Sequence, residues 1–549
     1  MLLQNTFMPR IPFWVFIVVA LLHLSAVRVD IMDIDATQYA EISREMAESG
    51  NYLHLYDRGN DYLDKPPFLF WVSAASMSVF GVSNFGYKLP SILFALWAIY
   101  ATYRLARLLY NEQIARMAAL ILGTCQGMFL MTNDIRTDTI LMSCVITAVW
   151  MIKESEIKRR WYWVLGGTLS IACGMMTKGP VALLVPLFCF GSGWILKRNW
   201  KQLFSPYHLL DALLIGIFLI PMSIGLYQQF DMHPEKTVNG LQGVSGLRFF
   251  YWSQSFGRIT GESPWDNGAG FEFLLSNMLW SFLPWIFIFI PASVVRIIEL
   301  IRLRFKLQPA QEWITMGGFL LTYIALGSSR YQLPHYIFVV FPLAAIITAS
   351  FLANIFEGKY TGMAKILKPA MIVVSALVLV ATLLTLVFVF PSGIPGIVLW
   401  IVAVVVWIYL VLNKSITGKM FWASASAITL ANIFLTHHFY YTLLQYQVGS
   451  QVGKYITENK ISTRVVAHEV EDPLNSIHFY AQRVVPRSAD AKSGDYVLTS
   501  DNGLKIFASQ PYTIVKKGVY FKVSELTPDF LNPETRNRAV KNYYLLKLN

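Results

Sequence analysis

Apolar stretches of about 20 residues, the length of a membrane-spanning helix, recur along the chain from Ile11 to about Leu435. Short loops that carry charges, Pro or Gly separate them. The pattern predicts a polytopic α-helical membrane protein with about 13 transmembrane helices. The predicted spans have centres near residues 20, 98, 123, 147, 168, 187, 217, 282, 319, 344, 380, 403 and 428.

Two apolar stretches near the N-terminus need separate interpretation. No small-residue cleavage pattern follows the first one before Asp30, so we interpret it as the first span and not as a signal peptide. Residues 65–81 are apolar but short for a span, and counting them as one would invert every later loop. We predict an interfacial helix there, with Phe70 and Trp71 as anchors in the headgroup plane.

Beyond about Tyr440 the sequence takes on a water-soluble character. Runs of β-branched or aromatic residues alternate with Asn, Asp, Gly and Pro turns, a pattern typical of strands. The runs are RVVAHE, IHFYAQ, DYVLTS, YTIVKKG and YYLLKLN. We therefore predict a transmembrane domain over residues 1–440, with its first outer loop at 30–82, and a small C-terminal α/β domain over residues 441–549.

Composition supports a membrane protein, and the distribution of charge predicts its orientation. Of the 549 residues, 55% are hydrophobic and only 14% are charged, against about 25% charged residues in a soluble domain. The net charge is +12, but Lys and Arg cluster in alternate short loops, as the positive-inside rule describes. This argues against nucleic-acid binding and predicts a cytoplasmic N-terminus, with the first loop and the C-terminal domain outside.

Carboxylates gather in the predicted outer segments. Asp35 follows the first span, Asp64 belongs to the same outer loop, and Asp138 lies in the outer turn of residues 133–138. A carboxylate suits sugar transfer from a lipid phosphate, because it can take a proton from an attacking hydroxyl or stabilise positive charge on the anomeric carbon. For each acid alone, the alternative is a solvated loop residue.

Cations lie on the same predicted side. Lys65, Lys178, Arg258 and Arg330 occupy outer loops, where they can neutralise a phosphate. For each one alone, the alternative is a side chain that contacts lipid headgroups. Lys178 lies between two apolar stretches, where an unpaired charge is costly, so we expect it to have an anionic partner.

Other motif classes are absent from the sequence. It has no Walker-type phosphate loop, no GxSxG nucleophile elbow and no HExxH zinc helix. His335 and Tyr336 stand at the start of a predicted span and are candidate substrate contacts. Interfacial hydrogen bonding is the alternative for His335.

Four segments, in order along the membrane region, carry a resemblance to a known family. They are DATQYAEISREM from Asp35, YLDKP from Tyr62, MTKG from Met176 and LPHY from Leu333. In these segments the chain resembles the lipid A 4-amino-4-deoxy-L-arabinose transferase family. More broadly, it resembles the type C glycosyltransferases, which include protein O-mannosyltransferases.

The resemblance implies a fold, a location and a donor. The fold is the type C glycosyltransferase fold, with interfacial helices in the first periplasmic loop and a periplasmic C-terminal domain. The location is a bacterial inner membrane, and the donor is an undecaprenyl-phosphate-linked sugar. By position, Asp35 corresponds to the family's essential first-loop carboxylate and Asp138 to its second required Asp. Tyr39, Tyr62 and Lys65 correspond to residues that line its lipid-phosphate site.

Two positions depart from the family pattern. Gln38 stands where the aminoarabinose transferases commonly have Arg, which removes a cation from the donor region. Ser255 stands in place of a His that joins the acid before Lys65 in binding zinc. We therefore predict no metal and no cofactor, with a divalent metal as the open alternative. Both departures weaken the case for aminoarabinose itself as the sugar.

The sequence as a whole predicts an integral membrane glycosyltransferase. It would move a sugar from a polyprenyl-phosphate donor to lipid A or a related glycolipid, with a protein or glycan hydroxyl as the alternative acceptor. We expect a monomer whose partners are the donor, the acceptor and membrane lipids. The rival interpretation is a multi-span transporter or lipid flippase, but no convincing internal repeat is found and the polar candidates cluster at one face.

The candidate site residues fall into three groups by predicted role. The predicted catalytic residues are Asp35 and Asp138; the predicted donor-binding residues are Lys65, Tyr39, Tyr62, Lys178, Arg258 and Arg330; the further predicted substrate contacts are Asp64, Gln38, His335 and Tyr336.

Overall fold

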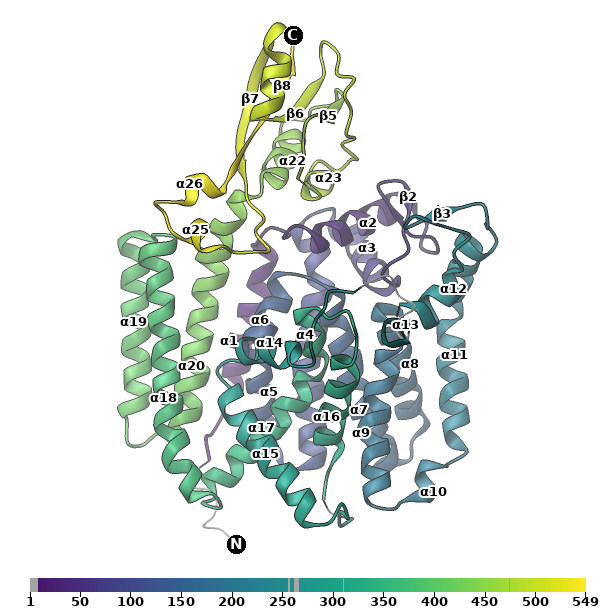
Figure 1. Ribbon diagram of the computed structural model, residues 1–549. Coiled ribbons are helices and arrows are strands. Elements are labelled where there is room, and N and C mark those ends of the chain that lie inside the picture. The colour runs from purple at the N-terminus through teal and green to yellow at the C-terminus, as the bar shows by residue number, and fades with distance from the viewer. Residues whose placement is uncertain (1–7, 255–256, 261–265, 310, 473) are drawn as a thin grey trace.

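The computed structural model describes residues 8–254, 257–260, 266–309, 311–472 and 474–549, and it leaves the side chains of Arg258 and Ile259 undescribed. Figure 1 shows a broad bundle of helices with a smaller α/β unit standing on one end. The N-terminus lies at the opposite end of the bundle from this unit, which carries the C-terminus.

Long helices make up the bundle. Those in its first half are α1 (Phe13–Ser25), α4 (Asn84–Leu109), α5 (Glu112–Thr124), α6 (Gln126–Asn133), α7 (Thr137–Lys158), α8 (Trp161–Lys178), α9 (Val181–Leu196) and α11 (Tyr207–Leu226). Those in its second half are α14 (Phe273–Ser281), α15 (Ile286–Arg302), α16 (Ile314–Gly327), α17 (Phe341–Phe356), α18 (Thr361–Leu384), α19 (Gly393–Leu412) and α20 (Lys419–Phe434).

Each predicted span centre except one falls inside one of these helices. Residue 282 lies instead in the break between α14 and α15. Pro284 stands in that break, and a proline lacks the N–H that would continue a helix. The chain between α5 and α6 also bends, by 52°, where Cys125 takes an extended conformation.

By length and composition alone, some helices of the bundle could cross a membrane. Among the described residues, five helical segments are long and apolar enough, and the bent α5–α6 pair would be a sixth. The five are Asn84–Leu109, Trp200–Asp231, Pro334–Phe356, Thr361–Val389 and Gly393–Leu412. Shorter apolar helices lie beside them at Phe13–Arg28, Phe68–Phe80, Val181–Leu196 and Ile314–Gly327.

Burial separates inner from outer helices of similar composition. In the span that contains α17, 94% of the most apolar window is buried inside the protein, whereas in α19 only 6% is. Figure 1 accordingly places α19 at the edge of the bundle, beside α18. An apolar helix that the protein does not cover requires an apolar surrounding, because exposing such a surface to water is costly. The outer helices are therefore suited to lipid.

Two helices of the first outer loop lie at the end of the bundle that faces the α/β unit (Figure 1). α2 spans Asp35–Ser49 and α3 spans Phe68–Phe80, the latter inside the segment for which an interfacial helix is predicted. α2 ends at Gly50, whose φ of +67° is a left-handed conformation that glycine adopts without strain. The two helices pack together through an apolar cluster that includes Tyr39 and Phe70.

The C-terminal unit is built on a four-stranded sheet of order β5-β6-β8-β7. β5 pairs with β6 in parallel, and the other neighbours are antiparallel. The strands are β5 (Val465–Ala467), β6 (Tyr496–Ser500), β7 (Tyr512–Tyr520) and β8 (Lys541–Leu548), and the helices are α22 (Val448–Glu458), α23 (Ser476–Tyr480), α24 (Asp501–Ile506), α25 (Pro528–Leu531) and α26 (Arg536–Ala539).

One run predicted as a strand is a helix. IHFYAQ lies largely in α23, whereas the other four runs contribute to strands β5 to β8. α23 packs against both α22 and α2, and every one of its residues is buried. Its apolar residues serve tertiary contacts on several sides of a short helix, so their β-branched and aromatic character does not indicate a strand.

The C-terminal unit is tied to the first outer loop by a buried polar contact. Asp33 accepts hydrogen bonds from the backbone N–H of Ser476 at 2.9 Å, from the Ser476 hydroxyl at 2.8 Å and from the Thr37 hydroxyl at 2.6 Å. Lys454 forms an ion pair with Asp30 at 2.6 Å nearby. Burial raises the pKa of Asp33 to about 6, although these hydrogen bonds act in the opposite direction. The stability linked to this contact therefore depends on pH.

We expect Asp33→Asn to remove this pH dependence. The pKa of Asp33 is 3.8 without the fold and about 6 within it, so the stability linked to this group is complete below pH 3.8 and is lost as the pH rises through about 6. The loss amounts to roughly 3 kcal/mol. The asparagine oxygen can still accept two of these hydrogen bonds, and its amide nitrogen can donate to the Ser476 hydroxyl. The variant should therefore be thermally more stable than the unchanged protein at pH 7.

The measurement is thermal unfolding in detergent at pH 5 and pH 7. Asp490→Asn serves as the control, because the Asp490 side chain is 73% exposed. If Asp33→Asn and Asp490→Asn show the same pH dependence as the unchanged protein, Asp33 is not the group responsible.

Candidate active site

Helix ends bring the predicted site residues together. Asp35 is the first residue of α2, and Asp138 lies in the first turn of α7. Lys178 is the last residue of α8, and His335 lies in the 3-10 helix η4 (Pro334–Val340). The positive end of a helix dipole favours a carboxylate, and the negative end favours a cation. Asp35, Asp138 and Lys178 thus each lie at the helix end whose dipole stabilises their charge.

Asp138 and Lys178 form a buried ion pair between α7 and α8. The Asp138 side chain is only 2% exposed and that of Lys178 is 14% exposed. His335 Nε2 lies 3.6 Å from the second carboxylate oxygen, and the Lys178 ammonium lies 4.1 Å from the centre of the Tyr336 ring, a cation–π contact. Lys178 therefore has the anionic partner that the sequence predicts, and the partner belongs to the protein.

Asp35 forms an ion pair with a residue that the sequence analysis does not single out. Arg136 Nη1 donates to Asp35 Oδ2 at 2.7 Å, and Arg136 Nε donates to Asp134 Oδ2 at 2.8 Å. The side chains of Asp35 and Arg136 are 42% and 22% exposed. This pair stands open to solvent at the end of the bundle, in contrast to the buried pair of Asp138 and Lys178.

Asp64 and Lys65 form a third acid–cation pair. Their closest contact is 2.8 Å, and the Lys65 side chain is 18% exposed. Gln254 donates to Asp64 Oδ1 at 3.0 Å and also to the main-chain carbonyl of Asp64. The outer segment that follows α11 is thereby attached to the first outer loop.

Two tyrosines lie close enough to Asp35 and Asp64 for these charges to act on their hydroxyls. The rings of Tyr39 and Tyr62 each meet the ring of Phe70 edge-on, at 5.8 Å between centres. Burial raises the pKa of both hydroxyls well above the usual value, and the negative charges of Asp35 and Asp64 raise them further. Both hydroxyls therefore stay protonated and able to donate. The Tyr62 hydroxyl is buried without a hydrogen-bond partner among the described residues.

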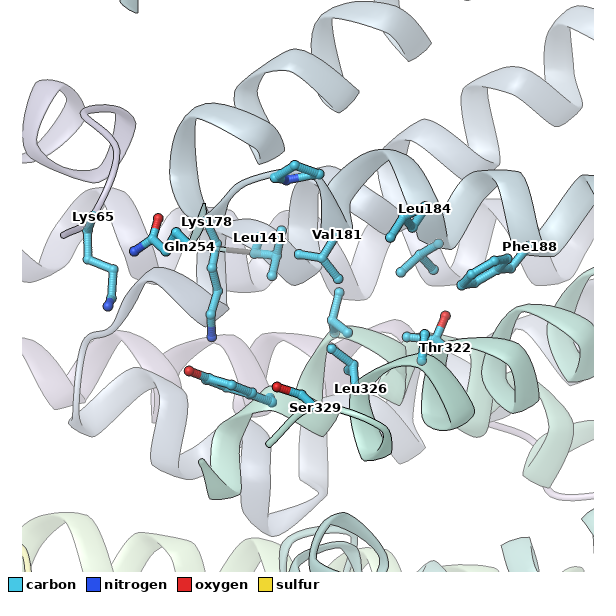
Figure 2. Close-up of a pocket in the computed structure, with 15 residues that line it drawn as sticks. Lys65, Leu141, Lys178, Val181, Leu184, Phe188, Gln254, Thr322, Leu326 and Ser329 are labelled. Carbon is cyan, nitrogen blue, oxygen red and sulfur yellow. The ribbon is translucent and has the colours of Figure 1, made fainter. Parts of the chain in front are cut away.

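A cavity of about 120 Å³ joins the lysines to an apolar channel between α9 and α16. Figure 2 shows the amine ends of Lys65 and Lys178 at one end of it, with Gln254 and Ser329 nearby. The other end is lined mainly by apolar side chains, among them Val181, Leu184, Phe188 and Leu326 (Figure 2). The cavity is thus cationic at its outer end and apolar along its length.

Comparisons with known proteins show what the chain is similar to. Residues 64–224 match the family model described as dolichyl-phosphate-mannose-protein mannosyltransferase. The chain is 27% identical over 333 residues to an undecaprenyl phosphate-alpha-4-amino-4-deoxy-L-arabinose arabinosyl transferase of Edwardsiella ictaluri, which covers 58% of this chain and 55% of the relative. It is 27% identical over 312 residues to a transferase of the same description from Pseudomonas fluorescens, covering 55% and 50%. The chain spans about half the length of these relatives.

The structural comparison extends over the whole chain. The crystal structure of ArnT from Cupriavidus metallidurans bound to undecaprenyl phosphate matches with a TM-score of 0.72 and 17% sequence identity, over 97% of both chains. Its apo form matches with a TM-score of 0.71. In sequence the chain is similar to these aminoarabinose transferases, and its fold is similar to that of ArnT. The resemblance that its motifs indicate is confirmed.

Several predicted residues lie away from the cavity lining. Gln38 donates to Asp57 Oδ2 at 2.8 Å, so its amide is engaged beside the site. Arg330 is exposed and forms no ion pair within the described part of the chain. The side chain of Arg258 and the whole of Ser255 lie outside the described residues. Within those residues, no three His, Cys, Asp or Glu side chains form a group that could hold a metal ion.

Arg136 and Asp134 are residues of the candidate site that the sequence analysis did not predict. The sequence does indicate a functional turn here, because residues 133–138 carry three charges in a six-residue outer turn between apolar helices. Only Asp138 was predicted there, from its place in the outer turn and from its match to a family position. Asp35 and Arg136 are 101 residues apart, and no local pattern links their side chains.

We expect Asp138→Ala to destabilise the protein by about 3–5 kcal/mol, because removing one partner of a buried ion pair leaves an uncompensated charge. The double variant Asp138→Ala with Lys178→Met should recover most of that stability, since no buried charge remains. Thermal unfolding in detergent measures both. Equal destabilisation by the single and the double variant would contradict the assignment of Asp138 as the partner that compensates Lys178.

Proposed function

We propose that the chain is an integral membrane glycosyltransferase that transfers a sugar from a polyprenyl-phosphate donor. The observation that carries the proposal is the shape and charge of the cavity. Its outer end presents Lys65 and Lys178, and its length is apolar. A lipid phosphate matches both parts of the cavity, because it has an anionic head and a hydrocarbon tail. Lysine is a suitable point charge for such a phosphate.

The two lysines act on the leaving group. As the bond between the anomeric carbon and the phosphate oxygen breaks, its electron pair passes to the polyprenyl phosphate, which gains a negative charge. Fixed cations at that position stabilise the charge as it develops. In the structure Lys65 and Lys178 pair with Asp64 and Asp138, so each ammonium is already held in place at the position where the phosphate would bind.

Asp35 acts on the other side of the sugar. It stands at the open end of the site, 42% exposed, where an acceptor can approach. For a hydroxyl acceptor, Asp35 takes the proton as the acceptor oxygen bonds to the anomeric carbon. For a phosphate acceptor, the oxygen is already ionised and Asp35 stabilises positive charge on the sugar. Asp138 supports the reaction by holding Lys178.

The acceptor that we favour is lipid A or a related glycolipid, with a protein or glycan hydroxyl as the alternative. The relatives are described as arabinosyl transferases that use an undecaprenyl-phosphate sugar, and the matching crystal structure contains undecaprenyl phosphate. These descriptions support a donor of that class here. They do not determine which sugar is transferred, because Gln38 lacks the charge of the family's Arg.

For the arrangement in the cell we propose a multi-pass protein of a bacterial inner membrane. About 13 spans place the N-terminus in the cytoplasm, as the positive-inside pattern requires. The site and the domain of residues 441–549 then face the periplasm. α3 lies in the interface, and the monomer works without a metal cofactor.

We expect Asp35→Asn to abolish sugar transfer while the protein stays folded, since the side chain is half exposed and its loss disturbs no packed helix. The measurement is conversion of a labelled lipid-linked sugar to product in proteoliposomes, with thermal unfolding as the check on folding. Transfer at the normal rate by Asp35→Asn would reject the assignment of Asp35.

We expect Lys65→Ala to raise the KM for the lipid donor by about tenfold or more, because it removes a charge-assisted contact to the phosphate. Lys492→Ala is the matched control, since the Lys492 side chain is 73% exposed in the C-terminal unit. Titration of the donor at a constant acceptor concentration measures the change. An unchanged KM would remove Lys65 from the donor site.

A transporter or flippase is distinguished by the same assay without an ion gradient. A transferase makes a larger product in detergent solution, where no compartments exist. Movement of lipid across a bilayer without any covalent product would favour the rival function.

A further inference from the structure

A groove lies between the first outer loop and the C-terminal unit, apart from the proposed catalytic cavity. Its volume is about 800 Å³, which is within the range of small-molecule sites, about 300–1,000 Å³. Three segments form it: the C-terminal half of α2, residues 51–59 of the same loop, and residues 482–484, which follow α23. Among the described residues, its lining has none in common with the cavity at Lys65 and Lys178.

Arg483 lines this groove without a partner from the protein. Its side chain is half-buried, and its Nε and Nη2 atoms are buried with no hydrogen-bond partner among the residues that the structure describes. Burial lowers the pKa of Arg483, and no charge in the described part of the chain raises it. Because a guanidinium stays protonated in proteins, the fold keeps a partly buried cation here at a cost that no internal contact offsets.

The other arginines of the lining have carboxylate partners. Arg44 forms an ion pair with Glu41 at 2.6 Å, and Arg58 forms one with Asp57 at 2.9 Å. Both belong to the first outer loop, whereas Arg483 approaches the groove from the C-terminal unit. Of the described arginines in the lining, Arg483 is therefore the one whose charge remains for a ligand.

The acids of the lining oppose an anion less than their number suggests. Glu48 is paired with Arg44 and is 52% exposed, whereas the Glu45 side chain is only 17% exposed. Burial and the charge of Glu41 raise the pKa of Glu45 to about 7, although a hydrogen bond from the Gly59 N–H acts in the opposite direction. Near neutral pH, Glu45 is thus protonated in about half of the molecules, and its neutral form can donate a hydrogen bond.

The rest of the lining suits the rings and hydroxyl groups of a sugar. Asn51, His54 and Gln482 contribute amide and imidazole groups, and His54 Nε2 is buried without a partner in the described part of the chain. A hydroxyl both donates and accepts, so sugar hydroxyls match such a mixed set of groups. Ile42 and Met46 of α2 add an apolar patch, against which the C–H groups of a sugar ring can pack.

We propose that this groove binds an anionic saccharide, whose carboxylate or phosphate group contacts Arg483. A planar guanidinium suits the oxygens of either anion. The ligand contacts both α2 and the segment after α23, so its binding stabilises the attachment of the C-terminal unit to the first outer loop. The inference goes beyond the proposed function, because neither the donor nor the transfer step takes part in it.

The experiment measures the binding of disaccharides to the full-length protein in detergent by isothermal titration calorimetry. The probes are digalacturonate, which carries carboxylates, maltose phosphate, which carries a phosphate, and neutral maltose. We expect at least one anionic disaccharide to bind about tenfold or more tightly than maltose, because it adds a charge-assisted contact. The tighter of the two anionic probes identifies the anion that the groove recognises.

Arg483→Gln should weaken binding of that anionic disaccharide by about tenfold or more. Without ligand, the variant should unfold at the same or a higher temperature than the unchanged protein, since it removes a partly buried charge that is not compensated. Glu45→Gln, which resembles the protonated acid, should bind the disaccharide at least as tightly as the unchanged protein. Arg487→Gln is the matched control, because Arg487 is exposed and lies outside the lining, four residues further along the chain.

Four results would overturn the proposal. They are equal binding of anionic and neutral disaccharides, no binding of any probe, unchanged binding by Arg483→Gln, and an equal loss in Arg487→Gln. A diaspartate peptide that binds as tightly as digalacturonate would assign the groove to peptides and reject a saccharide. Sugar transfer from the lipid donor, measured on the same samples, tests the proposed function separately, since binding in the groove is measured without donor.

Discussion

The ion pair between Asp138 and Lys178 is the contact on which the site depends. Both residues terminate apolar helices, and the carboxylate is almost completely buried. A single charge there would be costly, so the helices α7 and α8 can meet at this end with both charges present or with neither. Their pairing places an ammonium at the entrance of an apolar channel, and this ammonium suits a lipid phosphate.

The three acid–cation pairs of the site share one property that connects structure to the proposed chemistry. Each cation has a carboxylate partner, which stabilises the fold. In the proposed reaction the same carboxylates hold Lys65 and Lys178 in place for the donor phosphate.

Much of the fold was predictable because a membrane helix has a length and composition that local sequence reveals. Nearly all predicted span centres fall in helices. The break at Pro284 and the helix formed by IHFYAQ were not predicted, because the first depends on where a helix stops within an apolar stretch and the second on contacts of α23 with α2 and α22. Asp35, Asp138, Lys65 and Lys178 were identified from motif and position. Arg136 was missed, because its partner lies 101 residues away.

The sequence by itself determined that the chain is largely helical and apolar, with charged residues in the short segments between apolar stretches, because hydrophobicity and helix-end residues act over a few turns of chain. The tertiary structure alone decided which charges meet. It paired Asp35 with Arg136, gave Lys178 a carboxylate partner within the protein, and turned Gln38 toward Asp57. Such pairings depend on how helices pack, because ion pairs and hydrogen bonds form only at the short distances that packing creates.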